Sequence, residues 1–205
     1  MIGKISREKI HECLSGSLPG REAQERMSPK NRHDFECRDG LREAAVLLLF
    51  YPDRGDTRLV FMKRNEYDGP HSGQISFPGG MRELQDNNLL ATALRENEEE
   101  TGVPAESIDI IGKLTPLHIP VSNFCVHPFV GWTWEVPQFD PDETEVQYLI
   151  CPSLREIFDP ANRKSGTFHR HGVTLETPYF DIDGEMIWGA TAMILSEFMV
   201  LTGYC

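Results

Sequence analysis

The sequence predicts an α/β fold, a sandwich in which helices cover both faces of a mixed sheet. A continuous apolar run at 44–50 has the length expected of a strand inside a buried sheet. Further strand-length segments follow it, and two longer segments, at 87–101 and 188–201, have helical patterns. Strands that surround two principal helices are typical of a layered α/β/α arrangement.

The first 40 residues predict a helix followed by an extended arm. Residues 4–14 carry a weak apolar stripe with helical spacing. Residues 15–40 are rich in glycine, proline and charge, which favours an extended segment on the surface without chemistry of its own. We therefore divide the chain into an N-terminal helix and arm, 1–40, and one domain, 41–205.

The domain continues from the strand at 44–50 through alternating strand and turn signals. A hairpin-like turn is expected at 52–56, and 74–77 leads into a pair of glycines. A short helix is expected at 152–158, and the closing helix at 188–201 has apolar residues on its inward side. The remaining predicted strands are 58–63, 108–115, 126–135, 146–151, 167–175 and 179–182.

Composition and charge narrow the class of protein. With 205 residues, 40% of them hydrophobic and 25% charged, the chain suits one globular domain. A net charge of −12 makes nucleic acid an unlikely partner, because nucleic-acid binding requires a cationic surface. No apolar run is long enough to span a membrane, and the first residues lack the apolar centre of a signal peptide. We therefore expect a cytoplasmic protein with no membrane partner.

The cysteines indicate neither a zinc site nor a disulfide framework. They are odd in number and irregularly spaced, and no two of them have CxxC spacing. Reduced thiols are therefore expected. The sequence leaves open a homodimer, with the N-terminal arm covering its interface. The five residues are Cys13, Cys37, Cys125, Cys151 and Cys205.

An acidic helix after the pair of glycines is the most informative segment. Residues three and four apart share a helical face, so Glu96, Glu99 and Glu100 form one patch while Glu98 points elsewhere. Like charges at this spacing destabilise a helix by roughly 0.2–0.5 kcal/mol per pair, which a divalent cation would offset. Such oxygen ligands select Mg²⁺ or Mn²⁺, although an acidic run alone is more often a solvated face.

Signals for the two helix ends frame this acidic run. One of the polar residues at 86–88 can cap the start, and Gly102 is placed for a left-handed C-cap. Leu90 and Leu94 are expected to form the buried stripe. The framing favours a core-packed helix over an unstructured acidic segment.

The segment from Gly80 to Val103 resembles the Nudix box, the motif of the Nudix hydrolases. In that motif a glycine, five residues and a glutamate are followed, after seven residues, by Arg-Glu-hydrophobic-any-Glu-Glu-any-Gly-hydrophobic. The stretch from Arg95 onward matches the second half, except that Asn97 stands at an apolar position. Asp86 stands at the family glutamate, and eight residues rather than seven separate it from Arg95.

The sequence on both sides of the box resembles the coenzyme A pyrophosphatase branch of that family. The similar stretches are 63–80 upstream and 120–122, 128–131 and 187–192 downstream. The same branch has the aspartate and the extra helix residue. It usually has a basic residue where this chain has Gly69. The resemblance implies a Nudix-type α/β/α sandwich.

The resemblance also implies a divalent-metal site on the acidic helix. Glu96, Glu99 and Glu100 are the expected ligands of Mg²⁺ or Mn²⁺, and Glu99 or Glu100 is expected to orient or deprotonate the attacking water. Arg95 is expected to orient Glu99 through a bidentate contact.

Other candidates lie outside that helix. Nudix enzymes often use a loop glutamate, so Glu143 or Glu145 could serve, although a solvated acidic loop explains either equally well. Trp188 could line an acyl or pantetheine pocket, but a core position is the better expectation. Glycines at the turn permit close approach of a substrate. The expected substrate contacts are Lys63, Arg64, His71, Gly79, Gly80 and Arg82.

The hypothesis that follows is a metal-dependent hydrolase of coenzyme A or its derivatives, giving 3′,5′-ADP and 4′-phosphopantetheine. The alternative enzyme acts on another nucleoside diphosphate derivative, such as ADP-ribose, a dinucleotide or a nucleotide-capped RNA. Gly69 keeps this alternative open. A catalytically silent nucleotide-binding module is disfavoured, because all three box glutamates are present.

Overall fold

A mixed sheet forms the centre of the molecule. Its strand order is β2 (Asp56–Leu59), β1 (Arg42–Asp53), β8 (Phe124–Trp132) and β6 (Asp109–Lys113). β1 and β8 are parallel, whereas the other pairs are antiparallel, including β5 (Gly79–Met81) on β1 and β7 (Leu117–Ile119) on β8. The computed structural model describes residues 5–30, 32, 36–69, 71–170 and 173–203.

Two smaller antiparallel sheets flank this centre. One has the order β4 (Ile75–Ser76), β3 (Phe61–Arg64) and β9 (Val146–Ile150), and the other has the order β10 (Arg163–Arg170), β11 (Val173–Ile182) and β12 (Glu185–Trp188). Short 3₁₀ turns lie at Ala105–Ser107 and Pro160–Asn162. The α-helices are α1 (Arg7–Leu14), α2 (Gly20–Glu25), α3 (Leu89–Thr101), α4 (Leu154–Ile157) and α5 (Gly189–Leu201).

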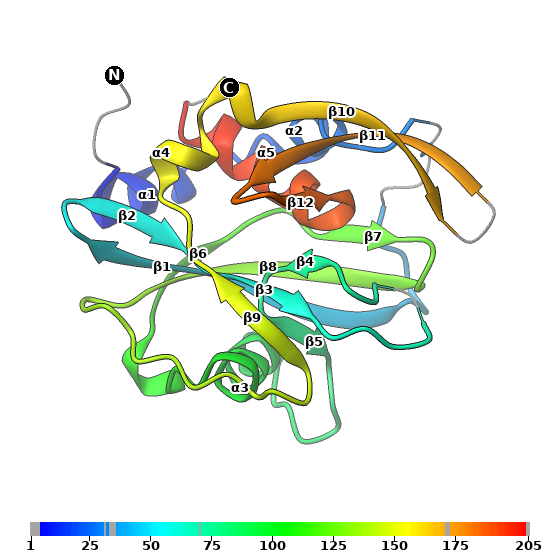
Figure 1. Cartoon of the computed structure of the whole chain (residues 1–205). Coiled ribbons are helices and arrows are strands. Elements are labelled where there is room, and N and C mark those ends of the chain that lie inside the picture. The colour runs from blue at the N-terminus through cyan, green and yellow to red at the C-terminus, as the bar shows by residue number, and fades with distance from the viewer. Residues whose placement is uncertain (1–4, 31, 33–35, 70, 171–172, 204–205) are drawn as a thin grey trace.

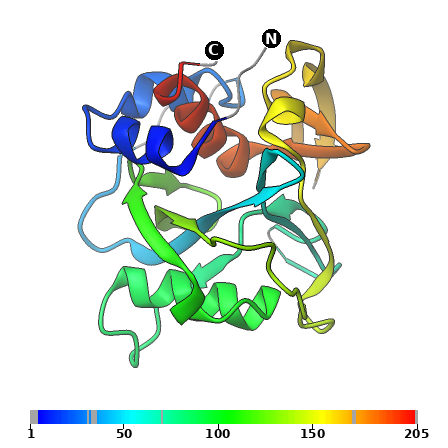
Figure 2. The same cartoon turned by 90° about the vertical axis from the view of Figure 1, so that its left-hand side faces the viewer.

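Helices cover both faces of the central sheet, which confirms the predicted α/β/α sandwich. Figures 1 and 2 show α3 on one face and α1, α2 and α5 on the other. Side chains of β1 alternate between two cores. Leu47 lies in the core that contains Ala93 of α3, whereas Leu48 and Phe50 lie in the other. There the ring of Phe50 stacks on Phe198 of α5, with 4.9 Å between centroids.

Several predicted strand boundaries are wrong. The single strand expected at 58–63 is divided at Val60 between β2 and β3, which belong to different sheets. The strand expected at 167–175 combines the end of β10 with the start of β11, the strand expected at 179–182 is the end of β11, and β12 was not predicted. A continuous apolar or alternating run does not reveal where a chain leaves one sheet and enters another.

The N-terminal arm is not extended throughout, as the sequence had suggested, because it contains α2. The buried carboxylate of Glu197 on α5 fixes this helix. It accepts hydrogen bonds from the Gly20 N–H (3.2 Å), from Gln24 Nε2 (2.8 Å) and from Thr115 Oγ1 (2.6 Å). Met27, just after α2, is fully buried in the core. The arm is therefore packed into the fold.

A disulfide joins Cys37 of the arm to Cys125 of β8, with 5.3 Å between Cα atoms. The expectation that all thiols are reduced is therefore wrong. Sequence spacing could not reveal this pair, because 88 residues separate the two cysteines. No helix in the described part of the chain is long and apolar enough to cross a membrane. The cytoplasmic location stays a prediction.

Candidate active site

A glycine turn brings β5 against β1 and against α3. Gly79 has a φ of 148°, and a Cβ atom there would lie 2.3 Å from the Ala45 carbonyl oxygen. A Cβ atom on Gly80 would lie 2.4 Å from the carboxylate of Glu96. Position 79 therefore requires glycine, whereas a side chain at position 80 would displace the Glu96 carboxylate, so the turn lies directly on a carboxylate of the acidic helix.

The acidic helix α3 begins and ends as its sequence indicates. The side chain of Asn88 accepts a hydrogen bond from the Ala91 N–H (2.9 Å), and Gly102 is left-handed with a φ of 74°. The buried stripe differs from the prediction, since Leu90 and Leu94 are only half-buried. The fully buried positions of α3 are Thr92, Ala93, Asn97, Glu100 and Thr101.

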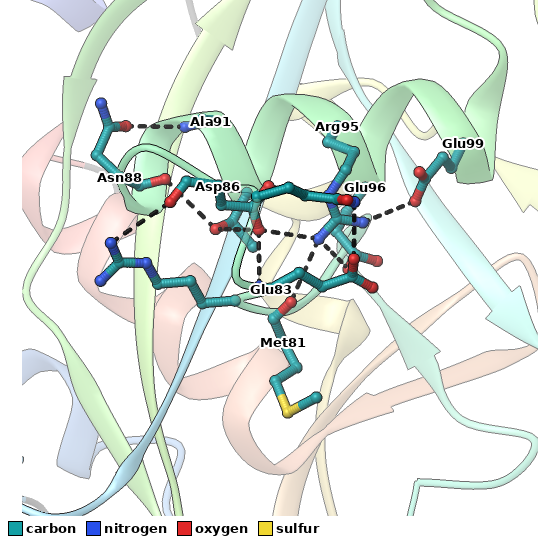
Figure 3. Close-up of polar contacts among 11 residues, drawn as sticks. Met81, Glu83, Asp86, Asn88, Ala91, Arg95, Glu96 and Glu99 are labelled. Atoms are coloured by element: carbon teal, nitrogen blue, oxygen red, sulfur yellow. Dashed lines mark hydrogen bonds and ion pairs between the residues drawn. The ribbon is translucent and has the colours of Figure 1, made fainter.

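Arg95 connects the loop before α3 to the carboxylates on it, as Figure 3 shows. Its bidentate partner is Asp86, with Nε–Oδ1 at 3.0 Å and Nη2–Oδ2 at 3.1 Å, and not Glu99 as predicted. A single hydrogen bond of 2.8 Å reaches Glu99, and Glu96 lies 3.0 Å away. The Arg95 hydrogen bonds hold the pKa of Asp86 well below its usual range. Asp86 therefore positions Arg95 within the site.

Glu100 is a buried carboxylate that is hydrogen-bonded to the backbone of the glycine turn. Its Oε2 accepts a hydrogen bond from the Gly79 N–H (2.7 Å), and Oε1 lies 3.6 Å from Arg64 with no hydrogen-bond partner among the described residues. Burial raises the pKa of Glu100 to about 8, although Arg64 and the Gly79 N–H oppose this. Such a group favours a nearby cation.

Glu96 and Glu100 fit a divalent cation, whereas Glu99 is turned away from them. Burial also raises the pKa of Glu96, and the charge of Glu96 raises the pKa of Glu100. The Glu99 side chain is 58% exposed and bonded to Arg95. Within the described residues, no three His, Cys, Asp or Glu side chains converge as a metal cluster. Mg²⁺ commonly binds through one or two carboxylates together with substrate phosphates, so the pair is a sufficient donor set.

The acidic loop before β9 brings one of its two candidate glutamates near this pair. Glu145 raises the pKa of both Glu96 and Glu100, which places its charge close to them. Glu143 is not among the main causes of either pKa shift, and its carbonyl oxygen accepts a hydrogen bond from Asn65 Nδ2 (2.9 Å). The structure therefore separates two residues that the sequence could not distinguish.

A groove of about 1510 Å³ opens onto the glycine turn. The turn, Arg64 and His71 form part of its lining. His71 is in the left-handed region, with a φ of 68°. Two other predicted substrate contacts lie outside the groove: Lys63 Nζ is 2.7 Å from Glu185 Oε2, and Arg82 pairs with Glu43 at 3.2 Å.

Sequence reasoning missed much of this groove. Pro29, Lys30 and Arg32 of the arm line it, although the arm had been expected to carry no chemistry. Trp188 is half-buried in its wall and is not a core residue. The hydrogen bonds of α2 to Glu197, the burial of Met27 and the disulfide bring the arm here, and none of these contacts has a local sequence signal. The main apolar lining residues are Val46, Phe77, Ile119, Val121, Phe124 and Leu175.

Comparisons with known proteins find similar sequences and structures. A family model described as "NUDIX domain" matches residues 41–169. Two relatives, each described as "Uncharacterized Nudix hydrolase NudL", come from Yersinia pestis (strain Pestoides F) and Yersinia pseudotuberculosis serotype O:1b (strain IP 31758). Both are 36% identical over 155 residues, which cover 75% of this chain and 76% of the relative.

Solved structures are similar at lower identity. One is the "Crystal Structure of a C. elegans Ap4A Hydrolase Binary Complex", with a TM-score of 0.48, 16% identity, and coverage of 58% of this chain and 84% of that chain. Another is a MutT/nudix family protein from Enterococcus faecalis, with a TM-score of 0.48, 13% identity, and coverage of 100% of this chain and 74% of that chain.

Proposed function

Because this chain belongs to the Nudix family of pyrophosphohydrolases, we propose that it cleaves the diphosphate bridge of coenzyme A or its derivatives. The products would be 3′,5′-ADP and 4′-phosphopantetheine, or its acylated or oxidised form. Nudix hydrolases act on nucleoside diphosphate derivatives and generally use divalent metal ions. The choice of coenzyme A and of Mg²⁺ or Mn²⁺ is our proposal.

The groove beside the glycine turn is the observation that carries this proposal. Its volume, about 1510 Å³, exceeds the roughly 300–1,000 Å³ common for ligand pockets. Its walls combine apolar side chains such as Ile119 and Trp188 with cations such as Arg64. Coenzyme A needs both surfaces, because it joins a phosphorylated nucleotide to a long pantetheine arm. ADP-ribose has no comparable arm.

In this proposal the carboxylates behind the glycine turn hold the metal. Glu96 and Glu100 are the ligands, and Glu99 joins them only if it leaves Arg95. When bound, a divalent ion neutralises charge on the diphosphate and lowers the pKa of a coordinated water. The absence of side chains at the two turn glycines lets the diphosphate approach these carboxylates.

Proton transfer from the attacking water needs a carboxylate that is not held by the metal, because metal-bound carboxylates are poor bases. Glu145 suits this role, since it is exposed and close to Glu96 and Glu100. Glu99 is the other candidate of the motif, but its carboxylate is bonded to Arg95, which Asp86 fixes in place. A Glu145→Gln substitution tests the first of these assignments.

A second candidate function is hydrolysis of another nucleoside diphosphate derivative. It is favoured by Gly69, which provides no cation where the coenzyme A branch usually has one. We propose that the catalytic domain spans 41–205 and that the arm, 1–40, completes the groove. A homodimer stays a prediction.

Product analysis tests this proposal. The purified protein would be incubated with Mg²⁺ or Mn²⁺ and, separately, with coenzyme A, ADP-ribose and a reduced dinucleotide, and the products separated by chromatography. Fastest release of 3′,5′-ADP from coenzyme A is the expected result. Turnover of another compound alone would reject the substrate, and no turnover of any compound would reject the hydrolase.

A further inference from the structure

Arg42, at the start of β1, lines the groove and lies against an aromatic ring. Its guanidinium lies over the ring of Phe124, with 4.2 Å from Cζ to the ring centroid. Its Nη2 also contacts Met81 Sδ at 3.1 Å, beside the glycine turn. Arg42 and Phe124 are directly paired in the parallel ladder of β1 and β8, and both line the groove. The side chain is therefore positioned by a ring and a thioether.

The charge of Arg42 is not matched within the described part of the chain. No described carboxylate lies within 4.0 Å of its guanidinium, although the protein has a net charge of −12. Two other cations that line the groove already have carboxylate partners. Lys30 pairs with Glu176 at 2.6 Å, and Arg64 lies 3.6 Å from Glu100. A planar guanidinium that lies on an aromatic ring directs its N–H donors outward, and the donors that do not contact Met81 suit the oxygens of a phosphate.

The distance from the glycine turn fits a nucleotide. Ala45 is the β1 partner of Gly80, so Arg42 lies three residues farther along the strand. At about 3.3 Å per residue, this corresponds to roughly 10 Å between the backbone of Arg42 and the turn. An arginine side chain can reach over part of that distance. A diphosphate at the turn therefore leaves room for one ribose before Arg42.

We propose that Arg42, seated on Phe124, binds the phosphate monoester on the ribose of the substrate, and so selects 3′-phosphorylated adenosine. This inference rests on the proposed function. Arg42 is thus a specificity-determining residue, separate from the carboxylates that hold the metal. An exposed arginine without such a role would be solvated and would not affect one substrate more than another.

Kinetics with two substrates test the assignment. We would compare coenzyme A with dephospho-coenzyme A, which differ only in the 3′-phosphate, using the wild-type protein, Arg42→Gln and Arg54→Gln. Arg54 is the matched control, because its side chain is 90% exposed in the turn between β1 and β2. Arg42→Gln should lower kcat/KM for coenzyme A by about 10- to 100-fold and leave dephospho-coenzyme A within about twofold. Arg54→Gln should change neither.

A second variant distinguishes the effect of the Phe124 ring from the effect of the Arg42 charge. Phe124→Leu keeps the arginine and removes the ring, so it should lower kcat/KM for coenzyme A less than Arg42→Gln does, again sparing dephospho-coenzyme A. An equal loss for both substrates in Arg42→Gln would overturn the proposal, because the contact would then be to a part they share. No loss for either would overturn it as well.

Binding without turnover keeps this test independent of the proposed function. Calorimetry would measure the affinities of 3′,5′-ADP and 5′-AMP for the wild-type protein and for Arg42→Gln. A wild-type preference for 3′,5′-ADP that disappears in Arg42→Gln supports the subsite, even if coenzyme A is not hydrolysed. A wild-type protein with no preference, or a preference that survives the substitution, would show that Arg42 does not bind this phosphate.

Discussion

Glu100→Gln should stabilise the metal-free protein while it abolishes the activity. The pKa of Glu100 is about 8 in the folded state and 4.5 in its ordinary state, so near pH 7 the folded form binds a proton that the unfolded form has lost. The contribution of Glu100 to stability is therefore greatest below about pH 4.5 and falls as the pH rises toward 8. At 1.36 kcal/mol per pKa unit, the loss near pH 7 is about 3 kcal/mol at most.

Glutamine at position 100 cannot ionise, and its carbonyl oxygen can still accept the Gly79 hydrogen bond. We therefore expect the metal-free variant to gain about 1–3 kcal/mol near pH 7, which corresponds to roughly 2–12 °C in Tm for a domain of this size. Mg²⁺ or Mn²⁺ should raise the Tm of the wild-type protein more than that of the variant. Turnover should fall by about 100-fold or more, because a metal ligand is lost.

Thermal unfolding between pH 5 and 8, with and without metal, measures these effects alongside turnover. Glu98→Gln is the matched control. It removes the same charge from an exposed position on α3, where the carboxylate only accepts a hydrogen bond from the Ala105 N–H (3.1 Å). This control should keep both its turnover and its pH slope. A Glu100→Gln variant with wild-type turnover, or with an unchanged pH slope of stability, would refute the assignment of Glu100.

Three further substitutions test other parts of the site and fold. Glu145→Gln should lower kcat by about 10²-fold or more, and by clearly more than Glu143→Gln, because the charge of Glu145 raises the pKa of both Glu96 and Glu100. Equal effects of the two substitutions in the kinetic assay would reject that choice. Asp86→Ala should lower the free energy of unfolding by about 3 kcal/mol in denaturant titrations, because Arg95 loses its bidentate partner. A decrease below about 0.5 kcal/mol would contradict this expectation. Cys37→Ser should lower the free energy of unfolding by about 2–4 kcal/mol, because the disulfide closes a long loop, and the Tm of this variant should not depend on reductant. A wild-type protein whose Tm is unchanged by reductant would argue against the disulfide.

Local features of the site could be predicted from the sequence because they depend on neighbouring residues. The caps of α3, the glycine turn and the orientation of Glu98 away from the patch follow from helical spacing and from the backbone needs of glycine. The strand at 44–50 lies within β1 for a similar reason, since its apolar residues fill a core on each face. These features need no information from distant parts of the chain.

Features that depend on distant contacts could not be predicted in this way. Arg95 has Glu99 one turn away on its helix, yet its bidentate partner is Asp86, which the loop before α3 folds back onto it. The arm reaches the groove through Glu197 and the Cys37–Cys125 disulfide, whose partners are far apart in the chain. Trp188 lines the groove because β12 ends beside it, which no local pattern indicates.

The most direct test of the metal-bound diphosphate site is a crystal structure with Mn²⁺ and 3′,5′-ADP, in which anomalous scattering locates the metal. We expect the Mn²⁺ peak beside Glu96 and Glu100, with the nucleotide in the groove and its 5′-phosphate next to Gly79 and Gly80. The 3′-phosphate should then face Arg42. A metal bound by other residues, or a nucleotide outside the groove, would contradict the assignment of this site as the catalytic centre.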